Sequence, residues 1–382
     1  MQIKFTHTIF LFFFLLISFC SEASLNKDLA SKDSLLVHSY IEGPHIRYTS
    51  TSRVDVFYIV HDSLKNTTKK ISKSFRFKKD SIFFKGFAGE DTLNYIIPKQ
   101  IKPQSGINPI NKNIVVLGDI HGEFESLLAI LRFNKVIDSN NKWSFGKGQV
   151  VFTGDVFDRG DEVTECLWLL FKLEMQAQKE GGDVHLLLGN HEMMALLFDV
   201  RYVDEKYIHA AHAYNYHYSH FFAKHTVLGK WLRSKNALVR IGEQLFVHGG
   251  ISPKFLEKKM KIDEVNVGMR YHLNNYTQLE DTTLVDLFLY SESPLWYRGY
   301  LSRTPNYDRI SLQDVLKTLE LYSSTVIIFG HTPVARVYPF YSFKLIAMDV
   351  PIGDPKFIDQ GLLIDNQMYY RIFAHKEKER IK

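Results

Sequence analysis

Five short polar motifs in this 382-residue chain each follow a run of apolar residues. The runs NIVVL, QVVFT, DVHLLL, EQLFV and STVIIF lead into the motifs GDIHG, GDVFDRG, GNHE, HGG and GHT. The side chains in these motifs that can bind a metal ion are those of Asp119, His121, Asp155, Asn190, His248 and His331. Gly and Asp are common in turns, so one such motif alone is consistent with a simple turn. Five motifs in the same position relative to an apolar run favour a shared function.

The ligand types indicate which metals the motifs could hold. Carboxylate oxygens, an amide oxygen and imidazole nitrogens together suit divalent ions such as Mn, Fe or Zn, whereas structural zinc sites commonly use thiolates. Six ligands drawn from five loops predict two ions that share one carboxylate and lie roughly 3.5–4 Å apart. The glycines beside each ligand allow sharp turns and a close approach of the loops.

The segments between the motifs predict the elements that position them. Continuous apolar runs from Asn113 onwards alternate with segments of helical spacing, with helix candidates at residues 123–133 and 161–180. Strands that are buried on both faces and alternate with helices are typical of an α/β fold. Because the loops at the carboxyl ends of such strands converge on one edge of the sheet, the motifs are expected to meet there.

The chain before the first motif has a different pattern of apolar and polar residues. Short alternating runs such as RVDVFYIV predict a small β-rich subdomain over residues 34–104. The segment PKQIKPQSGINPINKN is dense in Pro, Asn and Gly, and it predicts a linker. The domain that holds the five motifs is expected over residues 113–370, with a helical insert at about 193–235. The insert holds five histidines among Tyr, Phe and Ala residues, which favours a cap over the site, with a third metal site as the alternative.

The N-terminus predicts export. Residues 1–23 combine an early Lys, an apolar run from Thr8 to Phe19 and the small-x-small pattern Ser21-Glu22-Ala23, which is typical of a cleaved signal peptide. The run is shorter than the roughly 20 residues of a spanning helix, so no membrane span is expected after cleavage. Lipidation at Cys20 is the alternative, although the bulky residue before it argues against lipidation. The predicted location is periplasmic or secreted. Only Cys166 then remains, which excludes an intramolecular disulfide.

Composition excludes some partners. The chain is 45% hydrophobic and 23% charged, as is usual for a globular protein. Its formal net charge of +5 is small for this length and comes partly from the ends, so no nucleic-acid partner is expected. The residues leave the oligomeric state open.

The ordered series GDxHG, GDxxDRG, GNHE, HGG and GH resembles the calcineurin-like metallophosphoesterases, and specifically the PPP-type phosphoprotein phosphatases, from about Asn113 to Asp349. The segments LFVHGGIS, SPLWYRGY and GHTP are most similar to the bacterial Shewanella-like protein phosphatases. The resemblance implies an α/β four-layer sandwich of mixed β-sheets flanked by helices. It also implies hydrolysis of phosphate monoesters, with phosphorylated Ser, Thr or Tyr in proteins as the substrate class, by attack of metal-bound hydroxide.

The resemblance also implies a role for each site residue. Asp119, His121 and Asp155 would hold one ion, and Asp155, Asn190, His248 and His331 the other, so that Asp155 bridges them. His191 would be the general acid, oriented by Asp158, while Arg159, Arg298 and Asn190 would bind the substrate phosphate. Glu192 is expected to support its loop rather than to bind metal.

Several alternatives stay open at this point. Asp158 and Arg159 could simply pair with each other, and Arg298 could belong to a packing segment. A dinucleoside tetraphosphatase, or another small-molecule phosphoesterase, shares GDxHG and GNH, but those relatives usually carry Asp at the position of Glu192. The alternative to an enzyme is a phosphate-binding module without catalytic activity. Every expected motif is intact, which argues against this alternative.

Overall fold

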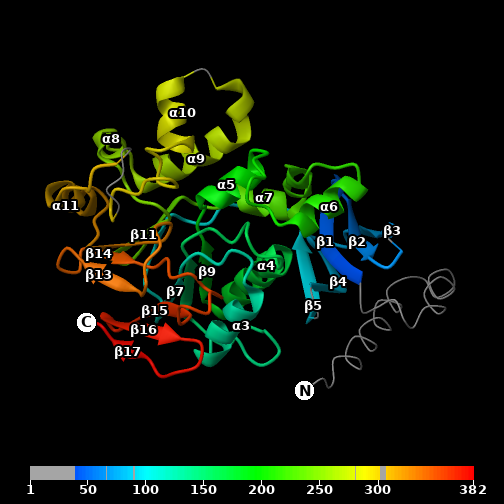
Figure 1. The fold of residues 1–382 in the computed structure, drawn as a ribbon, viewed down its shortest axis with the longest axis horizontal. Coiled ribbons are helices and arrows are strands. Elements are labelled where there is room, and N and C mark those ends of the chain that lie inside the picture. The colour runs from blue at the N-terminus through cyan, green and yellow to red at the C-terminus, as the bar shows by residue number, and fades with distance from the viewer. Residues whose placement is uncertain (1–38, 66, 89–90, 280, 302–306) are drawn as a thin grey trace. The chain divides into compact units, whose positions relative to one another are not determined.

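The computed structural model describes residues 39–382 except 66, 89–90, 280 and 302–306 (Figure 1). The predicted signal peptide and Cys20 lie outside the described residues. Over the described part of the chain, no helix combines the length and the apolar character needed to cross a bilayer. The chain divides into two compact units. One comprises residues up to 101 together with 204–230, and the other, called the catalytic unit below, comprises residues 102–203 and 231–382.

The catalytic unit contains two six-stranded sheets. The first runs in the order β17 (Glu379–Arg380), β16 (Met368–Phe373), β15 (Gln360–Asp365), β7 (Ile114–Leu117), β8 (Gln149–Phe152) and β9 (Asp183–Leu186). The second runs in the order β13 (Tyr338–Phe340), β14 (Leu345–Ala347), β12 (Val326–Phe329), β11 (Gln244–Val247), β10 (Leu238–Ile241) and β6 (Ile107–Asn108). Parallel pairing joins β7, β8 and β9 in the first sheet and β11, β12 and β14 in the second. Each sheet also has antiparallel pairs, such as β15 with β7 in the first and β10 with β11 in the second. Both sheets are therefore mixed.

Alternate residues of the strands face different layers. In β12, Val326 and Ile328 belong to the cluster that also contains Ile114 and Val116 of β7, so this cluster lies between the two sheets. Ile327 and Phe329 point the other way, into a cluster shared with helices of the second sheet's outer side. Both faces of these strands are apolar, which explains the continuous apolar runs in the sequence.

Helices cover the outer faces of both sheets. α3 (Phe124–Phe133) and α4 (Val163–Glu180) contact the first sheet, and both match the helices predicted from their spacing. The second sheet is covered by α8 (Pro253–Glu257), α9 (Ile262–Asn275), α10 (Thr282–Leu289) and α11 (Leu312–Leu321). Figure 1 shows these helices along one side of the catalytic unit. The predicted four-layer sandwich is confirmed.

The remaining unit combines the N-terminal β region with the insert. β1 (Ser39–Ser50), β2 (Arg53–Asp62) and β3 (Thr67–Arg76) form an antiparallel sheet, and β4 (Ser81–Ala88) pairs with β5 (Asp91–Pro98). The insert contributes α6 (Glu205–Ala213), η2 (Tyr218–Phe222) and the start of α7 (Val227–Arg233). His45 of β1 stacks on Phe221 with ring centroids 3.9 Å apart, and Phe57 of β2 stacks on Tyr214. The aromatic residues of the insert therefore pack on this sheet, and its role as a cap stays a prediction.

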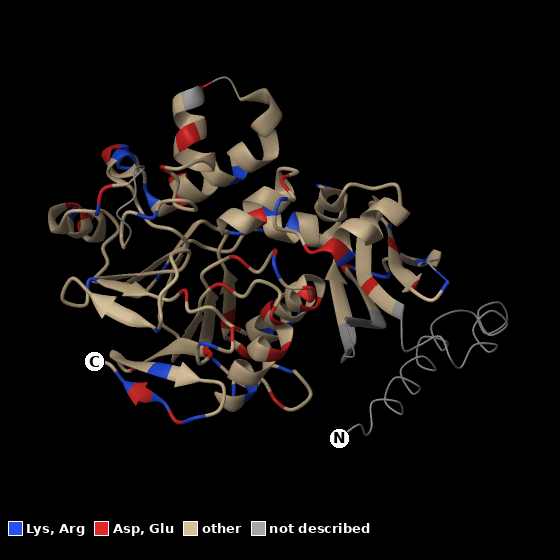
Figure 2. Cartoon of the chain, viewed as in Figure 1, with Lys and Arg blue, Asp and Glu red and all other residues tan. Residues whose placement is uncertain are grey.

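Acidic and basic residues are interspersed over the helices and strands of the catalytic unit, as Figure 2 shows. Among the described residues, the clusters able to hold a metal ion include none of the insert's histidines. The structure therefore offers no support for the third metal site that the sequence left open.

Candidate active site

The carboxyl ends of five strands deliver the predicted ligands to one region of the catalytic unit. β7, β8 and β9 are followed by Asp119, Asp155 and Asn190, while β11 and β12 are followed by His248 and His331. Two buried clusters of ligand atoms result, one of His121, Asp155 and His191 and one of Asp155, His248 and His331, and within each cluster the atoms lie within 4.8 Å of one another. Asp155 belongs to both clusters.

Asp155 occupies the centre of the site. Its Oδ2 atom lies 3.2 Å from Nε2 of His248, 3.8 Å from Nε2 of His191 and 4.0 Å from Nε2 of His121. Its Oδ1 atom accepts the backbone N–H of His191 at 2.9 Å. The neighbouring Gly154 has a φ of +109°, and a Cβ atom there would lie 2.7 Å from the nitrogen of Gly189. Only glycine permits this backbone conformation and this close approach.

Each of the three histidines expected to bind metal is anchored through its other ring nitrogen to a backbone carbonyl oxygen. The contacts join Nδ1 of His121 to Phe157 at 2.7 Å, Nδ1 of His248 to Thr153 at 2.9 Å, and Nε2 of His331 to Trp296 at 3.0 Å. A carbonyl oxygen only accepts, so the anchored nitrogen carries the hydrogen. In His121 and His331, whose pKa values are lowered, the opposite nitrogen then keeps a lone pair. Nε2 of His248 faces two acceptors, Oδ1 of Asn190 and Oδ2 of Asp155, and despite burial the charge of Asp155 raises the pKa of this ring. The anchoring contacts fix the orientation of each ring, as in known metal sites.

The electrostatics of the site call for cations. Burial, together with the nearby Asp349 and Asp155, raises the pKa of Asp119 well above its usual range. Burial lowers the pKa of His121 to about 4 and holds that of His331 well below its ordinary value, so both rings are neutral at pH 7. Despite burial, the charge of Asp155 raises the pKa of His248 and of His191, so this carboxylate favours positive charge beside it. A buried carboxylate is costly without such charge, and carboxylates with imidazoles are a good donor set for divalent ions. The residues therefore fit a dinuclear centre.

Asn190 and Asp119 complete the ligand set predicted from the sequence. The Oδ1 atom of Asn190 lies 3.0 Å from Nε2 of His248, so the amide oxygen and this ring nitrogen face the same point. Both carboxylate oxygens of Asp119 accept the backbone N–H of His331, at 3.1 and 3.2 Å. This contact ties the end of β7 in one sheet to the loop after β12 in the other.

Glu192 holds the motif loops together. Its carboxylate accepts the backbone N–H groups of Asp155 at 2.8 Å, Val156 at 2.7 Å and Gly189 at 2.7 Å. Its side chain is fully buried. Its two oxygens are thus engaged by backbone donors of two loops, which agrees with a supporting role rather than a metal-binding one.

The pair expected to act as general acid and orienting group is formed. Nδ1 of His191 donates to Oδ2 of Asp158 at 2.6 Å, and both side chains are buried. Burial lowers the pKa of His191, but the charge of Asp155 and the hydrogen bond to Asp158 more than offset this effect, and the pKa is raised. A raised pKa favours the protonated ring that a general acid needs.

The two arginines differ in their surroundings. Arg159 is exposed next to the buried Asp158, and its backbone N–H donates to the carbonyl oxygen of Tyr202 at 2.9 Å. Arg298 is half-buried, and its guanidinium donates to the carbonyl oxygen of His331 at 2.5 Å. Its neighbours Tyr297 and Tyr300 are buried in the core, so the segment SPLWYRGY packs and also brings an arginine beside a ligand loop.

Two residues of the site were not found from the sequence. Asp349 follows β14, which is the same strand-end position as the predicted ligands, so the pattern could have identified it. Burial and the charge of Asp155 raise the pKa of Asp349 to about 6. Tyr202 lies with its ring centroid 5.4 Å from that of His191, and no motif indicates this contact.

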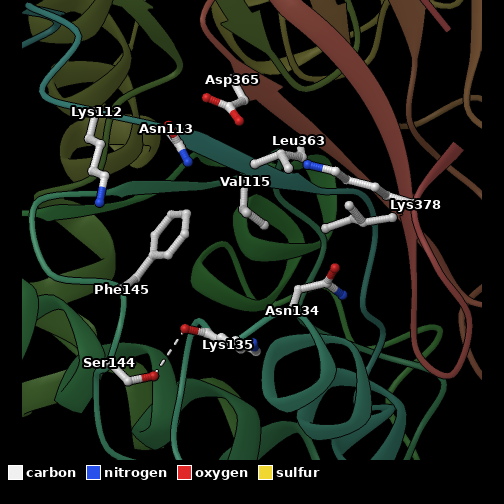
Figure 3. A pocket seen from close by; sticks show the side chains of 11 residues that line it. Lys112, Asn113, Val115, Asn134, Lys135, Ser144, Phe145, Leu363, Asp365 and Lys378 are labelled. Atoms are coloured by element: carbon white, nitrogen blue, oxygen red, sulfur yellow. Dashed lines mark hydrogen bonds between the residues drawn. The ribbon is translucent and has the colours of Figure 1, made fainter. Parts of the chain in front are cut away.

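A separate pocket of about 310 Å³ lies at the start of β7 (Figure 3). Val115, Phe145 and Leu363 provide its apolar wall, and Lys112 and Lys378 lie at its edge. The residues that line it include none of those predicted for the site.

The catalytic unit has two facing mixed sheets, and buried His and Asp side chains lie together at the ends of their strands. This combination is that of a metal-dependent phosphoesterase. Residues 112–335 match the family model described as Calcineurin-like phosphoesterase, and the chain belongs to this family. The resemblance inferred from the motifs is confirmed.

Similar proteins extend the comparison. Shewanella-like protein phosphatase 1 of Plasmodium berghei (strain Anka) is 31% identical over 272 residues, which are 70% of this chain and 74% of that protein. The crystal structure of a cold-active protein-tyrosine phosphatase of a psychrophile, Shewanella sp., is 30% identical, with a TM-score of 0.78 over 90% of this chain and 100% of that one. A second structure of a cold-active protein tyrosine phosphatase is 31% identical, with a TM-score of 0.79 over 90% of this chain and 98% of the other.

Proposed function

We propose that this chain is an exported phosphoprotein phosphatase that hydrolyses phosphorylated Ser, Thr or Tyr with the help of two divalent ions. The observation that carries the proposal is the sharing of Asp155 between two buried clusters of ligand atoms. One of these clusters also contains His191, which is paired with Asp158. Asp119, His121 and Asp155 would hold one ion, and Asp155, Asn190, His248 and His331 the other. When bound, the ions would supply an acidified water as the nucleophile.

The side chains around the centre divide the remaining work. His191 keeps its proton on Nε2 while Nδ1 binds Asp158, so Nε2 can protonate the leaving oxygen of the ester. The guanidinium groups of Arg159 and Arg298, with the amide of Asn190, bind the phosphate oxygens and stabilise the charge of the transition state. The integrity of this set supports an enzyme over a non-catalytic phosphate-binding module.

The choice of a protein substrate is supported by the similar proteins, whose names describe them as protein phosphatases and protein-tyrosine phosphatases. Glu192, in place of the Asp usual in dinucleoside tetraphosphatases, supports the same choice. Neither feature selects among Mn, Fe and Zn, so the metal is part of the test.

The test uses the purified chain loaded separately with Mn, Fe or Zn. Phosphotyrosine, phosphothreonine and phosphoserine peptides of one sequence are compared with a dinucleoside tetraphosphate, and Asp155→Asn serves as the inactive control. We expect kcat/KM for at least one phosphopeptide to exceed that for the dinucleotide by tenfold or more. A preference for the dinucleotide would overturn the protein-phosphatase proposal. Binding of phosphate without turnover, with every metal, would support the non-catalytic module instead.

Export is tested separately by expressing the full chain in a bacterium and sequencing the N-terminus of the protein recovered from the periplasm. We expect the mature chain to begin at Ser24. A chain recovered from the cytoplasm with its first residues intact would contradict export. A lipid-modified Cys20 would contradict cleavage after Ala23 but not export.

A further inference from the structure

An exposed aromatic ring lies directly against the proposed general acid. The ring centroids of Tyr202 and His191 are 5.4 Å apart, with an angle of 50° between the ring planes. Tyr202 is 50% exposed, whereas His191 is buried. The carbonyl oxygen of Tyr202 also accepts the backbone N–H of Arg159 at 2.9 Å. Tyr202 therefore contacts the proton donor through its ring and a phosphate-binding residue through its backbone.

The loop after α5 (Asn190–Leu196) brings Tyr202 to this place. Phe198 has a φ of +68°, in the left-handed region, and the N–H of Asp199 donates to the carbonyl oxygen of Met194 at 2.9 Å. This contact ends the helix in the way that usually employs glycine. The guanidinium of Arg201 then binds the carboxylate of Asp199, with its shortest contact at 2.7 Å. The chain thus turns back sharply, and residue 202 returns to the side of His191.

We infer that Tyr202 is a specificity residue that packs against the leaving group and favours aryl over alkyl phosphate esters. The inference rests on the proposed function, because it uses His191 as the proton donor. The leaving oxygen must lie within hydrogen-bond distance of Nε2 of His191 when it is protonated. The carbon skeleton attached to that oxygen then begins beside His191, where the ring of Tyr202 is half exposed and the guanidinium of Arg201 lies 5.7 Å from the ring centroid.

An aromatic leaving group gains more from this ring than an aliphatic one does. Two aromatic rings attract each other in offset or edge-to-face arrangements with centroids roughly 4.5–7 Å apart, beyond the effect of buried area alone. The phenyl ring of phosphotyrosine can make this contact, whereas the short side chains of phosphothreonine and phosphoserine cannot. Tyr202 therefore favours phosphotyrosine within the proposed substrate class.

A purely structural role for Tyr202 makes a different prediction. If the ring only keeps His191 in place, its removal slows alkyl esters at least as much as aryl esters, because alkyl leaving groups depend more on protonation. If the ring binds the leaving group, its removal acts on aryl esters alone. The ratio of kcat/KM values for two substrates in the same variant separates the two roles.

The test compares the parent chain with Tyr202→Ala and Tyr202→Phe, all loaded with the same metal. The substrates are a phosphotyrosine and a phosphothreonine peptide of otherwise identical sequence. We expect Tyr202→Ala to lower kcat/KM for the phosphotyrosine peptide about 3- to 10-fold, the size of an aromatic pair, and for the phosphothreonine peptide less than about 2-fold. Tyr202→Phe keeps the ring and should retain the preference. Tyr290→Ala, at a tyrosine that is 60% exposed at the end of α10, is the matched control.

Binding provides a readout that does not depend on turnover. Calorimetric affinities of phenylphosphonate and methylphosphonate are measured for the same variants, and Tyr202→Ala should remove most of the advantage of the phenyl compound. Equal losses for both peptides, a larger loss for the phosphothreonine peptide, or no loss for either would overturn the inference. If the parent hydrolyses no phosphopeptide but Tyr202→Ala still removes the phenyl advantage, the proposed protein substrate fails and the inference about Tyr202 stands.

Discussion

Nδ1 of His191 lies 2.6 Å from Oδ2 of Asp158, and the backbone at Asp158 and Arg159 has positive φ angles of 69° and 71°. Two successive non-glycine residues in the left-handed region are costly, and such strain is concentrated at functional sites. Here the unusual backbone directs the carboxylate of Asp158 toward the imidazole while the next side chain, Arg159, remains exposed. The alternative in which Asp158 serves only to pair with Arg159 does not account for this geometry.

Replacement of His191 by Ala should lower kcat for alkyl phosphate esters about 10²–10⁴-fold, the usual contribution of a general acid. The loss should be smaller for aryl esters such as p-nitrophenyl phosphate, whose leaving groups need little protonation. Steady-state kinetics on both esters checks the prediction, with metal content measured as the control. Equal losses for alkyl and aryl esters would show that His191 has another role.

The Asp155→Asn variant should lose nearly all activity and bind less metal. Its carboxylate is shared by both ligand clusters, and an amide cannot supply the negative charge that holds two cations. Elemental analysis after dialysis, together with kcat/KM, provides the measurement. Activity within a few-fold of the parent would contradict a dinuclear site centred on Asp155.

Substitution of Arg298 separates a phosphate contact from a packing role. We expect Arg298→Ala to raise KM and lower kcat together, and Arg298→Lys to restore little, because an ammonium group does not reproduce the planar fork of a guanidinium. Metal content should not change, and inorganic phosphate should inhibit the variant less than the parent. Normal inhibition by phosphate with a lower melting temperature would assign Arg298 to packing instead.

The Glu192→Gln variant should be less stable by about 1–3 kcal/mol, the cost of leaving buried donors unsatisfied. In this variant an NH2 group replaces one of the two carboxylate oxygens. That NH2 group would face either the backbone N–H of Val156 or the backbone N–H groups of Asp155 and Gly189, which then lose their acceptor. Urea unfolding of the metal-free chain measures the change. Glu180→Gln, at an exposed position near the end of α4, is the control and should stay within about 0.5 kcal/mol of the parent.

His185 should make the chain sensitive to acid. It is buried in β9, away from the metal ligands, and burial lowers its pKa to about 4. The folded state therefore binds fewer protons than the unfolded state between pH 6.5 and pH 4, so stability is lost as the pH falls through this window.

The His185→Leu variant tests this contribution. Between about pH 7.5 and pH 5, the metal-free parent should lose about 2 kcal/mol more stability than the variant, as calculated from these pKa values. Urea unfolding at both pH values gives the difference. The same loss in both proteins would show that His185 does not titrate in this range.

The sequence by itself determined the family, the order of the strands that end in ligands and the types of metal that the ligands suit. These features are local, because an apolar run followed by Gly and a polar residue describes a strand and its carboxyl end within about ten residues. The parallel arrangement of such strands then brings distant motifs together without further information. For the same reason the residues around Asp119, Asp155 and His248 could be assigned from the sequence.

Only the tertiary structure decided which nitrogen of each histidine faces the centre, because the anchoring carbonyls of Phe157, Thr153 and Trp296 come from other segments of the chain. It also brought Asp349 into the site and grouped the insert with the N-terminal sheet. The contact between Tyr202 and His191 depends on a left-handed backbone at Phe198, a conformation that no sequence rule assigns to phenylalanine. Spacing along the chain encodes periodicity, whereas these contacts depend on how loops pack in space.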